Sequence, residues 1–392
     1  MHAGQIRLIH HRTRRGALQL LLMFFFALGL ISLLLAIDIA SVYTVRAQVR
    51  AASESAVLSA GLTLMDDRRL LPDPQVRAML IEAALHAGQE VAVANGLQGS
   101  SGAQRGSAAT IEFSLDFAHS GGGRELESRI PDLIRGRGYR SNATGNGIPL
   151  VLPGLLSMGP FDLSVESVAL IDRDIVGFRP QPGRTVPLVP LVVRSDPTGI
   201  AAQSWESMIK DTSQDRFAFE PTNFGFLENQ ADGLPEVALS LGANTIPLLL
   251  NENAEVAKSI ASGVDTAALS SSGGEIWSMT PEQRIRLMTA EDLQNRQAGL
   301  FDSLELVRQS GEARIWPLTR DSLSPGGYIQ ITGFVAARIV RVEAGSQVRA
   351  WVQPAALSTS TAITLRDVGF DQRRTLGMIV PNPYIAKVRL FQ

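Results

Sequence analysis

The strongest hydrophobic pattern in the chain is an uninterrupted apolar segment near its start. Residues 16–37 contain no charged side chain, and at about 1.5 Å per residue a helix over this range is roughly 33 Å long. Because a bilayer hydrocarbon core is about 30 Å thick, the segment predicts a membrane-spanning helix. Its length and the lack of an Ala-x-Ala-like site favour an uncleaved signal anchor over a cleaved signal peptide.

The charges on either side of this segment predict its orientation. Four arginines and no acidic residue precede it, at positions 7, 12, 14 and 15. Positive charge is enriched on the cytoplasmic side of membrane helices. We therefore expect residues 1–15 to be cytoplasmic, residues 16–37 to span the bilayer once, and the bulk of the chain to be exported from a bacterial inner membrane.

The helical pattern continues beyond the apolar segment. Residues 32–60 include neither Gly nor Pro. A stripe at helical spacing runs along this stretch and comprises Val42, Val45, Val49, Ala52 and Ala56. Residues 74–94 repeat the helical spacing after a proline, so a second helix should pack on the first. Together these patterns predict a helical stalk over residues 38–97.

Small side chains surround the stripe, so a neighbour can approach this helix closely. Val45, Val49, Ala52 and Ala56 are the candidate contact residues. The spacing is the same whether the neighbour is this chain's own domain or a helix of another subunit, which could be a second copy of the chain. Asp38, the first charge after the span, is expected to meet headgroups or water, and the alternative is a polar contact with another membrane helix.

The rest of the chain has the pattern of a mixed domain. Residues 98–108 are rich in Gly and Ser and predict a linker, and residues 109–392 form the exported domain. Apolar and polar residues alternate from 111 to 117, as in a half-buried strand. Further strands are expected at 161–170, 186–194, 328–342, 348–352 and 384–390. The ranges 109–199 and 313–392 are therefore the β-rich parts.

Residues 200–312 have a more helical pattern. Thr280 followed by Pro281, and Thr289 followed by Asp292, are typical of helix starts. The fold class that we predict is α+β, with a single N-terminal transmembrane helix that extends into a helical stalk, followed by a β-rich exported domain with helical insertions.

Composition argues against several kinds of chemistry. The net charge of −2 gives no general attraction to nucleic acid, and a chain without cysteine has no thiol nucleophile and no disulfide. His86 and His119 are isolated histidines, with no second His or Cys at helical spacing. Asp172 and Asp174 could contribute to a divalent-ion site, but strand alternation favours one solvated face, and residues 66–69 have the pattern of a solvated, charged turn. We expect no catalytic residue, no cofactor and no metal.

The N-terminal residues resemble a known family. Arg14-Arg15-Gly16, the apolar run, Ala36-Ile37-Asp38, Val42-Tyr43 and Val45-Arg46-Ala47-Gln48, followed by Ala- and Ser-rich helix to Gly61, are similar to the start of TadE/TadG-like proteins of tight-adherence (Flp) pilus assembly. Residues 221–225 (PTNFG) and 332–338 (TGFVAAR) also resemble exported parts of TadG-like chains. The resemblance implies an inner-membrane protein whose exported domain assists pilus or secretion assembly.

Two departures from the family limit what the resemblance implies. Cleavage after Gly16 would place Leu21 where small processed relatives carry a Glu, so prepilin processing is not expected. No Asp-x-Ser-x-Ser metal site of a von Willebrand A domain is present. The function that we predict is non-catalytic docking of other pilus-assembly or envelope proteins. The alternatives are a membrane-tethered hydrolase-like enzyme and a tethered module that binds a ligand or wall polymer.

Overall fold

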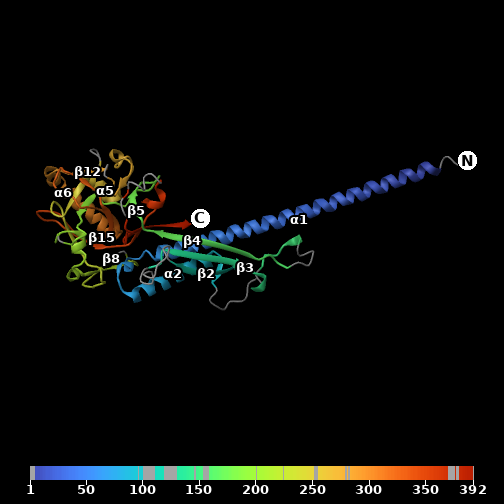
Figure 1. The fold of residues 1–392 in the computed structure, drawn as a ribbon, viewed down its shortest axis with the longest axis horizontal. Helices are drawn as coiled ribbons and strands as arrows, with labels where there is room; N and C mark the ends of the chain where they lie inside the picture. Colours follow the sequence, from blue (N-terminus) through green and yellow to red (C-terminus); the bar gives the residue numbers. More distant parts are fainter. Residues whose placement is uncertain are drawn as a thin grey trace.

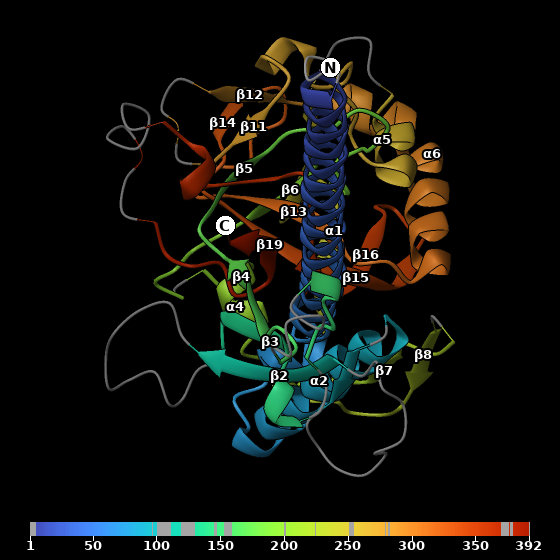
Figure 2. The ribbon, with the colours of Figure 1, turned by 90° about the vertical axis from the view of Figure 1, so that its right-hand side faces the viewer.

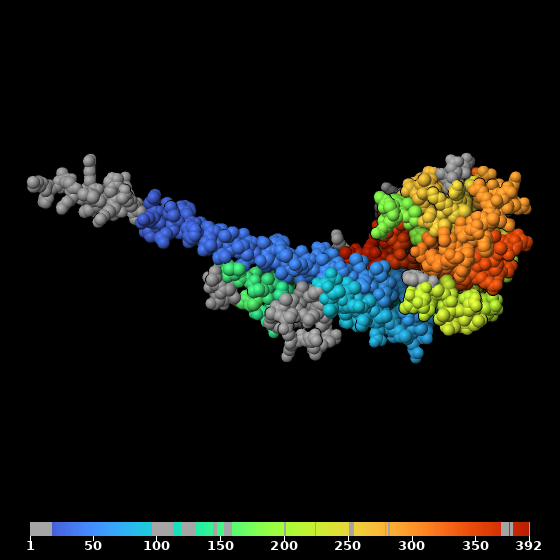
Figure 3. All heavy atoms as spheres, turned by 180° about the vertical axis from the view of Figure 1, so that it is seen from behind, coloured from blue at the N-terminus to red at the C-terminus, as the bar shows by residue number. Residues whose placement is uncertain are grey.

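The protein is elongated, with a free helix at one end and a globular body at the other (Figure 1). The computed structural model describes residues 5–95, 97–99, 111–118, 130–144, 147–152, 159–199, 201–223, 225–250, 255–278, 280, 283–369, 376 and 379–391. Side chains are described within these ranges except for 5–17, 97–99, 111, 112 and 144. Figure 3 shows the helix extending alone until the stalk and then the body join it.

Helix α1 (Gln5–Thr63) runs without interruption from the apolar segment into the stalk. Its most apolar 18-residue window has a mean hydropathy of 2.9 and no buried residue, so this helix is long and apolar enough to cross a membrane. No proline interrupts it, and the hydroxyls of Ser32, Ser41 and Thr44 donate back to carbonyls four residues earlier. The continuation that the sequence predicts is confirmed.

Helix α2 (Pro74–Ala94) packs antiparallel on the C-terminal part of α1, as predicted. Its start follows the expected chemistry, because the Asp73 side chain accepts the backbone N–H of Gln75 and a proline occupies the first helical position. A short 3-10 helix, η1 (Asp67–Leu70), makes the turn between α1 and α2. These three elements form one layer of the stalk.

A six-stranded sheet forms the second layer of the stalk. Its order is β1-β2-β3-β4-β19-β17. The bounds are β1 Leu97–Gly99, β2 Ile111–Ala118, β3 Leu133–Arg140, β4 Leu163–Asp172, β17 Leu357–Ser358 and β19 Ile385–Phe391. The neighbours β2-β3, β3-β4 and β4-β19 are antiparallel, so the last strand of the chain is held in the sheet, as predicted.

The body contains an eight-stranded mixed sheet in the order β14-β12-β10-β6-β13-β15-β16-β9. Helices α5 (Val256–Ser262) and α6 (Ala290–Ser310) pack on each other beside this sheet, with α6 against β15 (Figure 2). The strand bounds are β6 Leu191–Arg194, β9 Val237–Ser240, β10 Thr245–Leu249, β12 Arg284–Leu287, β13 Arg314–Thr319, β14 Tyr328–Gln330, β15 Gly333–Glu343 and β16 Arg349–Pro354.

Smaller elements complete the body. A three-stranded sheet has the order β11-β5-β18 and a two-stranded hairpin pairs β7 with β8. Their bounds are β5 Ile175–Phe178, β7 Phe217–Glu220, β8 Gly225–Glu228, β11 Ile276–Trp277, β18 Ala362–Thr364 and α4 Trp205–Met208. The core that joins the large sheet to the helices includes Phe178 and Phe334, whose rings meet edge to face at 4.8 Å between centroids.

The predicted elements were right where the pattern was long. Ala350 pairs with Val342 across the turn at Gly345, as expected, and Thr289 caps α6 by accepting the N–H of Asp292.

The helix expected after Thr280 is wrong, because the described residues that follow it form strand β12. Residues 200–312 are mixed, not mainly helical, since β7 to β12 lie there. Most of the predicted linker, from residue 100 to 108, lies outside the described residues.

The boundary between stalk and exported domain also differs from the prediction. Strands β2, β3 and β4 pack on α1 and α2, so the described residues between 111 and 172 belong with the stalk and not with the body. The sequence suggested a stalk of helices alone. The packed pair of α1 and α2 has two faces that would otherwise be open to solvent. The sheet supplies the apolar surface that buries one of these faces.

Candidate functional site

The stripe of α1 lies inside this chain's own core. Val49, Ala52 and Ala56 are buried, and Val45 packs against the same cluster. Their neighbours come from α2, β2, β4 and the β3–β4 connection: Ala92, Phe113, Leu163, Val165 and Ile148. The expectation of a partner helix at these four positions is therefore corrected, because the chain's own sheet and second helix cover the surface.

Two glycines of β3 allow this close contact. A Cβ atom built on Gly136 would lie 2.5 Å from Val57 Cγ1, and one on Gly138 would lie 2.7 Å from Val49 Cγ1. Real side chains do not approach so closely, so only glycine lets the sheet rest on α1. A usable signal for this contact is present in the sequence, since glycines two apart on a strand face the same side.

Asp38 contacts a distant part of the same chain. Its carboxylate accepts the backbone N–H groups of Val151 at 2.6 Å and Leu152 at 2.8 Å, and Asp38 is 5% exposed. Residues 151 and 152 are helical, so the carboxylate satisfies donors at the start of a helical turn. Neither expectation for Asp38 was correct. It meets the β3–β4 connection instead of headgroups, water or another membrane helix.

A largely buried ion pair joins the stalk to the body. Asp67 in η1 and Arg338 in β15 lie 2.9 Å apart, with their side chains 12% and 15% exposed. Asp67 also accepts the N–H of Ala356, and the Arg338 guanidinium lies 4.0 Å from the Phe219 ring centroid. Burial raises the pKa of Asp67, against the opposing effect of Arg338. The solvated turn expected at residues 66–69 is thus wrong for Asp67, which joins the two parts of the protein.

A cavity of about 580 Å³ lies beside this junction and is rich in arginine. Arg69 and Arg77 reach it from the stalk and Arg173 reaches it from the segment after β4. The body contributes apolar residues and prolines: Ile209, Leu234, Pro235, Pro354, Val380, Pro381, Pro383 and Tyr384. Among the described residues, none of the three arginine side chains forms an ion pair with a carboxylate.

The electrostatics of this arginine cavity favour an anion. Burial, and after it the nearby Arg173 guanidinium, lower the pKa of Arg69 to about 10. Arg69 is therefore still protonated at neutral pH. Burial of its charge is unfavourable in free energy, and a negative ligand bound beside it would reduce that penalty. Its described polar contacts are weak, a 3.5 Å bond to the Leu64 carbonyl and a contact with the Met65 sulfur. Guanidinium groups suit carboxylate and phosphate geometry.

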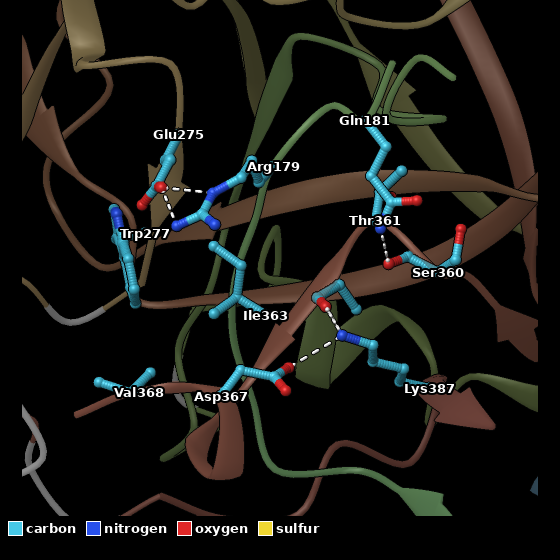
Figure 4. A pocket seen from close by; sticks show the side chains of 11 residues that line it. Arg179, Gln181, Glu275, Trp277, Ser360, Thr361, Ile363, Asp367, Val368 and Lys387 are labelled. Atoms are coloured by element: carbon cyan, nitrogen blue, oxygen red, sulfur yellow. Dashed lines mark hydrogen bonds and ion pairs between the residues drawn. The ribbon is translucent and has the colours of Figure 1, made fainter. Parts of the chain in front are cut away.

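A second cavity, of about 380 Å³, lies between β5, β11 and β18 (Figure 4). Trp277 and Ile363 form an apolar side, while Glu275 pairs with Arg179 and Asp367 pairs with Lys387 at 2.9 Å. Despite partial burial, hydrogen bonds from Thr364 and Lys387 and the nearby cations lower the pKa of Asp367. Asp367 is therefore held in its ionised form beside cations, whereas a general acid must be protonated.

The other titratable candidates have structural roles. Asp172 is 3% exposed and its carboxylate lies 2.6 Å from Arg389, so the solvated strand face expected for Asp172 and Asp174 is wrong. Among the described residues, no group of His and acidic side chains could hold a metal ion. His86 is an exposed residue of α2, and His119 lies outside the described residues.

Comparison with protein-family models, with curated proteins and with solved structures finds no match to this chain. Function must therefore be argued from the stalk and from the two cavities.

Proposed function

We propose that this chain is a single-pass membrane protein that holds an exported α+β domain at a fixed position above the bilayer and docks other envelope proteins without catalysis. The resemblance of its N-terminal residues to TadE/TadG-like proteins supports a role in Tad/Flp-type pilus or related secretion assembly at a bacterial inner membrane. One observation carries the proposal. In α1, an exposed apolar segment long enough to span a bilayer continues without a break into the part of the helix that is buried in the stalk core.

Continuity of the helix has a mechanical consequence. A flexible loop after the span would let the domain rotate and tilt independently of the membrane. Here the same helix forms the span and the centre of the stalk, and the Asp67–Arg338 pair ties the stalk to the body. Displacement of the membrane helix is therefore transmitted to the body, which is the property that an assembly factor needs.

The arginine cavity is the docking surface that we propose. It lies where stalk and body meet, and among the described residues its arginines form no ion pair with a carboxylate, although the Arg173 charge acts on the neighbouring Asp174. The prolines and apolar side chains on the body side suit an extended peptide segment. An acidic segment of an envelope partner would pair with the arginines and pack on these apolar residues.

Photo-crosslinking in cells tests the proposal. The buried Ala52 is unsuitable as a crosslinking position, whereas Val380, at the cavity, is 78% exposed. A photoreactive residue at Val380 should give adducts with pilin-like or secretion-platform proteins, and one at Leu306, 56% exposed on α6, should not. The combined Arg69→Gln, Arg77→Gln and Arg173→Gln variant should lose the Val380 adducts. Equal adducts at both positions, or adducts unaffected by the arginine changes, would contradict docking at this cavity.

A second candidate function is binding of a polar ligand in the cavity of Figure 4. It rests on Trp277, whose ring lies near the charged side chains of Glu275 and Arg179, in a cavity that Ser360 and Thr361 also line. An aromatic ring with a few polar groups around it is an arrangement that ligand sites use. Titration with wall-derived glycans, followed through tryptophan fluorescence in the full chain and in Trp277→Phe, tests it. A response of the same size in both proteins would exclude this cavity.

A further inference from the structure

The connection between β3 and β4 is unusual in charge. Arg140 and Asp162 are the charged residues that bound it, and the 141–161 sequence, SNATGNGIPLVLPGLLSMGPF, has none. An exported loop in contact only with water normally carries charged or polar side chains. The composition of this connection therefore needs another explanation.

The structure fixes the height of this connection relative to the span. Asp38 is the first charged residue after the uncharged run of 16–37, so it marks the outer end of the span. Val151 and Leu152 donate to its carboxylate at 2.6 and 2.8 Å, which places them at the same level along α1. Figure 1 shows the described residues of the β3–β4 connection as the part of the sheet layer nearest to the free length of α1.

Apolar side chains at this level are left uncovered by the protein. Val151 and Phe161 are each 46% exposed, and Tyr43, just over one turn beyond Asp38 on α1, is 68% exposed. Phe161 is held in place by a pair of backbone hydrogen bonds with Ile148, at 2.8 and 2.9 Å, and Ile148 is itself buried in the stalk core. The stalk core therefore holds the backbone that carries Phe161 in place, and the exposed side chains face outward.

We infer that residues 147–152 and 159–161 of the β3–β4 connection form a second membrane contact, inserted into the outer interfacial layer of the bilayer beside α1. This inference rests on the proposed anchoring of α1. The occupant is lipid because the exposed side chains lie at the depth where headgroups meet acyl chains, and aromatic residues such as Tyr43 and Phe161 favour that depth. The lack of charge is what insertion requires, since each ionised group there would cost free energy.

The contact has a consequence for the stalk. A single helix can rotate about its own axis and change its tilt in a bilayer. A second contact beside it, locked to the helix by the Asp38 carboxylate, fixes which side of the stalk faces the membrane. The body and its arginine cavity would then be presented in one orientation.

The chain has no cysteine, so single-cysteine variants of the full protein can be labelled without background. We would place an environment-sensitive fluorophore at Val151→Cys, at Leu28→Cys inside the span and at Val380→Cys on the body, in vesicles of phosphatidylethanolamine and phosphatidylglycerol. Quenching would be compared between lipids with a shallow or a deep nitroxide and with aqueous iodide. The Val151 side chain points outward while its N–H binds Asp38, so the label should leave that contact intact.

We expect the shallow nitroxide to quench the Val151 label several-fold more than the Val380 label, and the deep nitroxide to quench the Leu28 label. Suppose that the lipid nitroxide quenches the Leu28 label, while the Val151 label is quenched by iodide and not by lipid nitroxides. That result would overturn the second contact and leave the membrane anchor standing. A Val151 label protected from both iodide and lipid nitroxides would show a protein cover and would also overturn it. Absence of lipid quenching at Leu28 would overturn the anchor, and this inference with it.

Discussion

The Asp38 carboxylate accepts the backbone N–H of Val151 at 2.6 Å, although the two residues are 113 positions apart in the chain. This bond joins the end of the apolar span to the tip of the stalk sheet. It explains why an acid can lie at a helix position that is 5% exposed, since the buried charge is satisfied by two N–H donors.

Replacing Asp38 with Ala should release the tip of the stalk. Charge-assisted hydrogen bonds contribute about 1.5–3 kcal/mol each when buried, and less at an interface. We therefore expect hydrogen exchange at Val151 and Leu152 to accelerate at least tenfold, while α6 exchanges as before. Ser41→Ala is the matched control, because the Ser41 hydroxyl contacts only the carbonyl of Ile37. Equal protection in both variants would contradict the role of Asp38.

Replacing Gly136 or Gly138 with Val should push β3 away from α1. Each new side chain would begin within 2.7 Å of a valine methyl carbon on the helix, and overpacking of this kind costs about 1–3 kcal/mol. Gly225→Val on the hairpin is the control, since its nearest neighbour lies 3.8 Å from a built Cβ. Chemical denaturation in detergent should show a loss of stability for the β3 variants alone. A Gly138→Val protein as stable as the control would refute the close contact.

Replacing Ser53 with Ala should stabilise the protein. Ser53 is fully buried, and among the described residues its hydroxyl has no hydrogen-bond partner. Removing an unsatisfied polar group and gaining helix propensity together should contribute about 1 kcal/mol. Ser55→Ala on the exposed face changes mainly the helix propensity, because the Ser55 hydroxyl already bonds the carbonyl of Ala51. A larger gain at position 55 than at 53 would count against an unpaired hydroxyl.

Removing the Arg338 guanidinium should leave Asp67 as a buried, uncompensated charge. Arg338→Met is expected to cost about 3–5 kcal/mol, whereas the double variant with Asp67→Asn should recover part of that loss. Double electron–electron resonance between labels on α2 and α6 would report a broader distance distribution in Arg338→Met. A single variant with unchanged stability and an unchanged distribution would show that the pair does not fix the body on the stalk.

Asp232 should make stability depend on pH. Burial, assisted by Asp215, raises the pKa of Asp232 to about 6, above its value in an unfolded chain. The folded state therefore retains a proton that the unfolded state has lost, so stability is greatest below about pH 4 and falls as pH rises to about 6. Allowing for partial solvent exposure, the change is roughly 1 kcal/mol.

Asp232→Asn tests this assignment, because the amide oxygen can still accept the N–H of Leu234. Denaturation midpoints of the parent chain should fall between pH 4 and pH 6, and those of the variant should be flatter over that range. A parallel pH profile in both proteins would assign the dependence to other groups, such as Glu236, whose pKa is also raised by burial.

Patterns local in sequence determined much of the fold. The apolar run, the proline-free continuation and the capped start of α2 are set by side-chain periodicity and by helix-end hydrogen bonding, so they could be predicted without knowledge of any neighbour. The alternation at 111–117 and the hairpin across Gly345 were predictable for the same reason.

What lies on the stripe of α1 was decided only by the tertiary structure. Val49, Ala52 and Ala56 would look the same in sequence whether covered by another subunit or by β2, β4 and α2. Likewise, nothing local to Asp38 or Asp67 identifies Val151 or Arg338 as the partner. Long-range pairs depend on how the chain brings distant segments together, and residue spacing does not record this. The arginine cavity, assembled from the stalk and the body, is hidden from sequence for that reason.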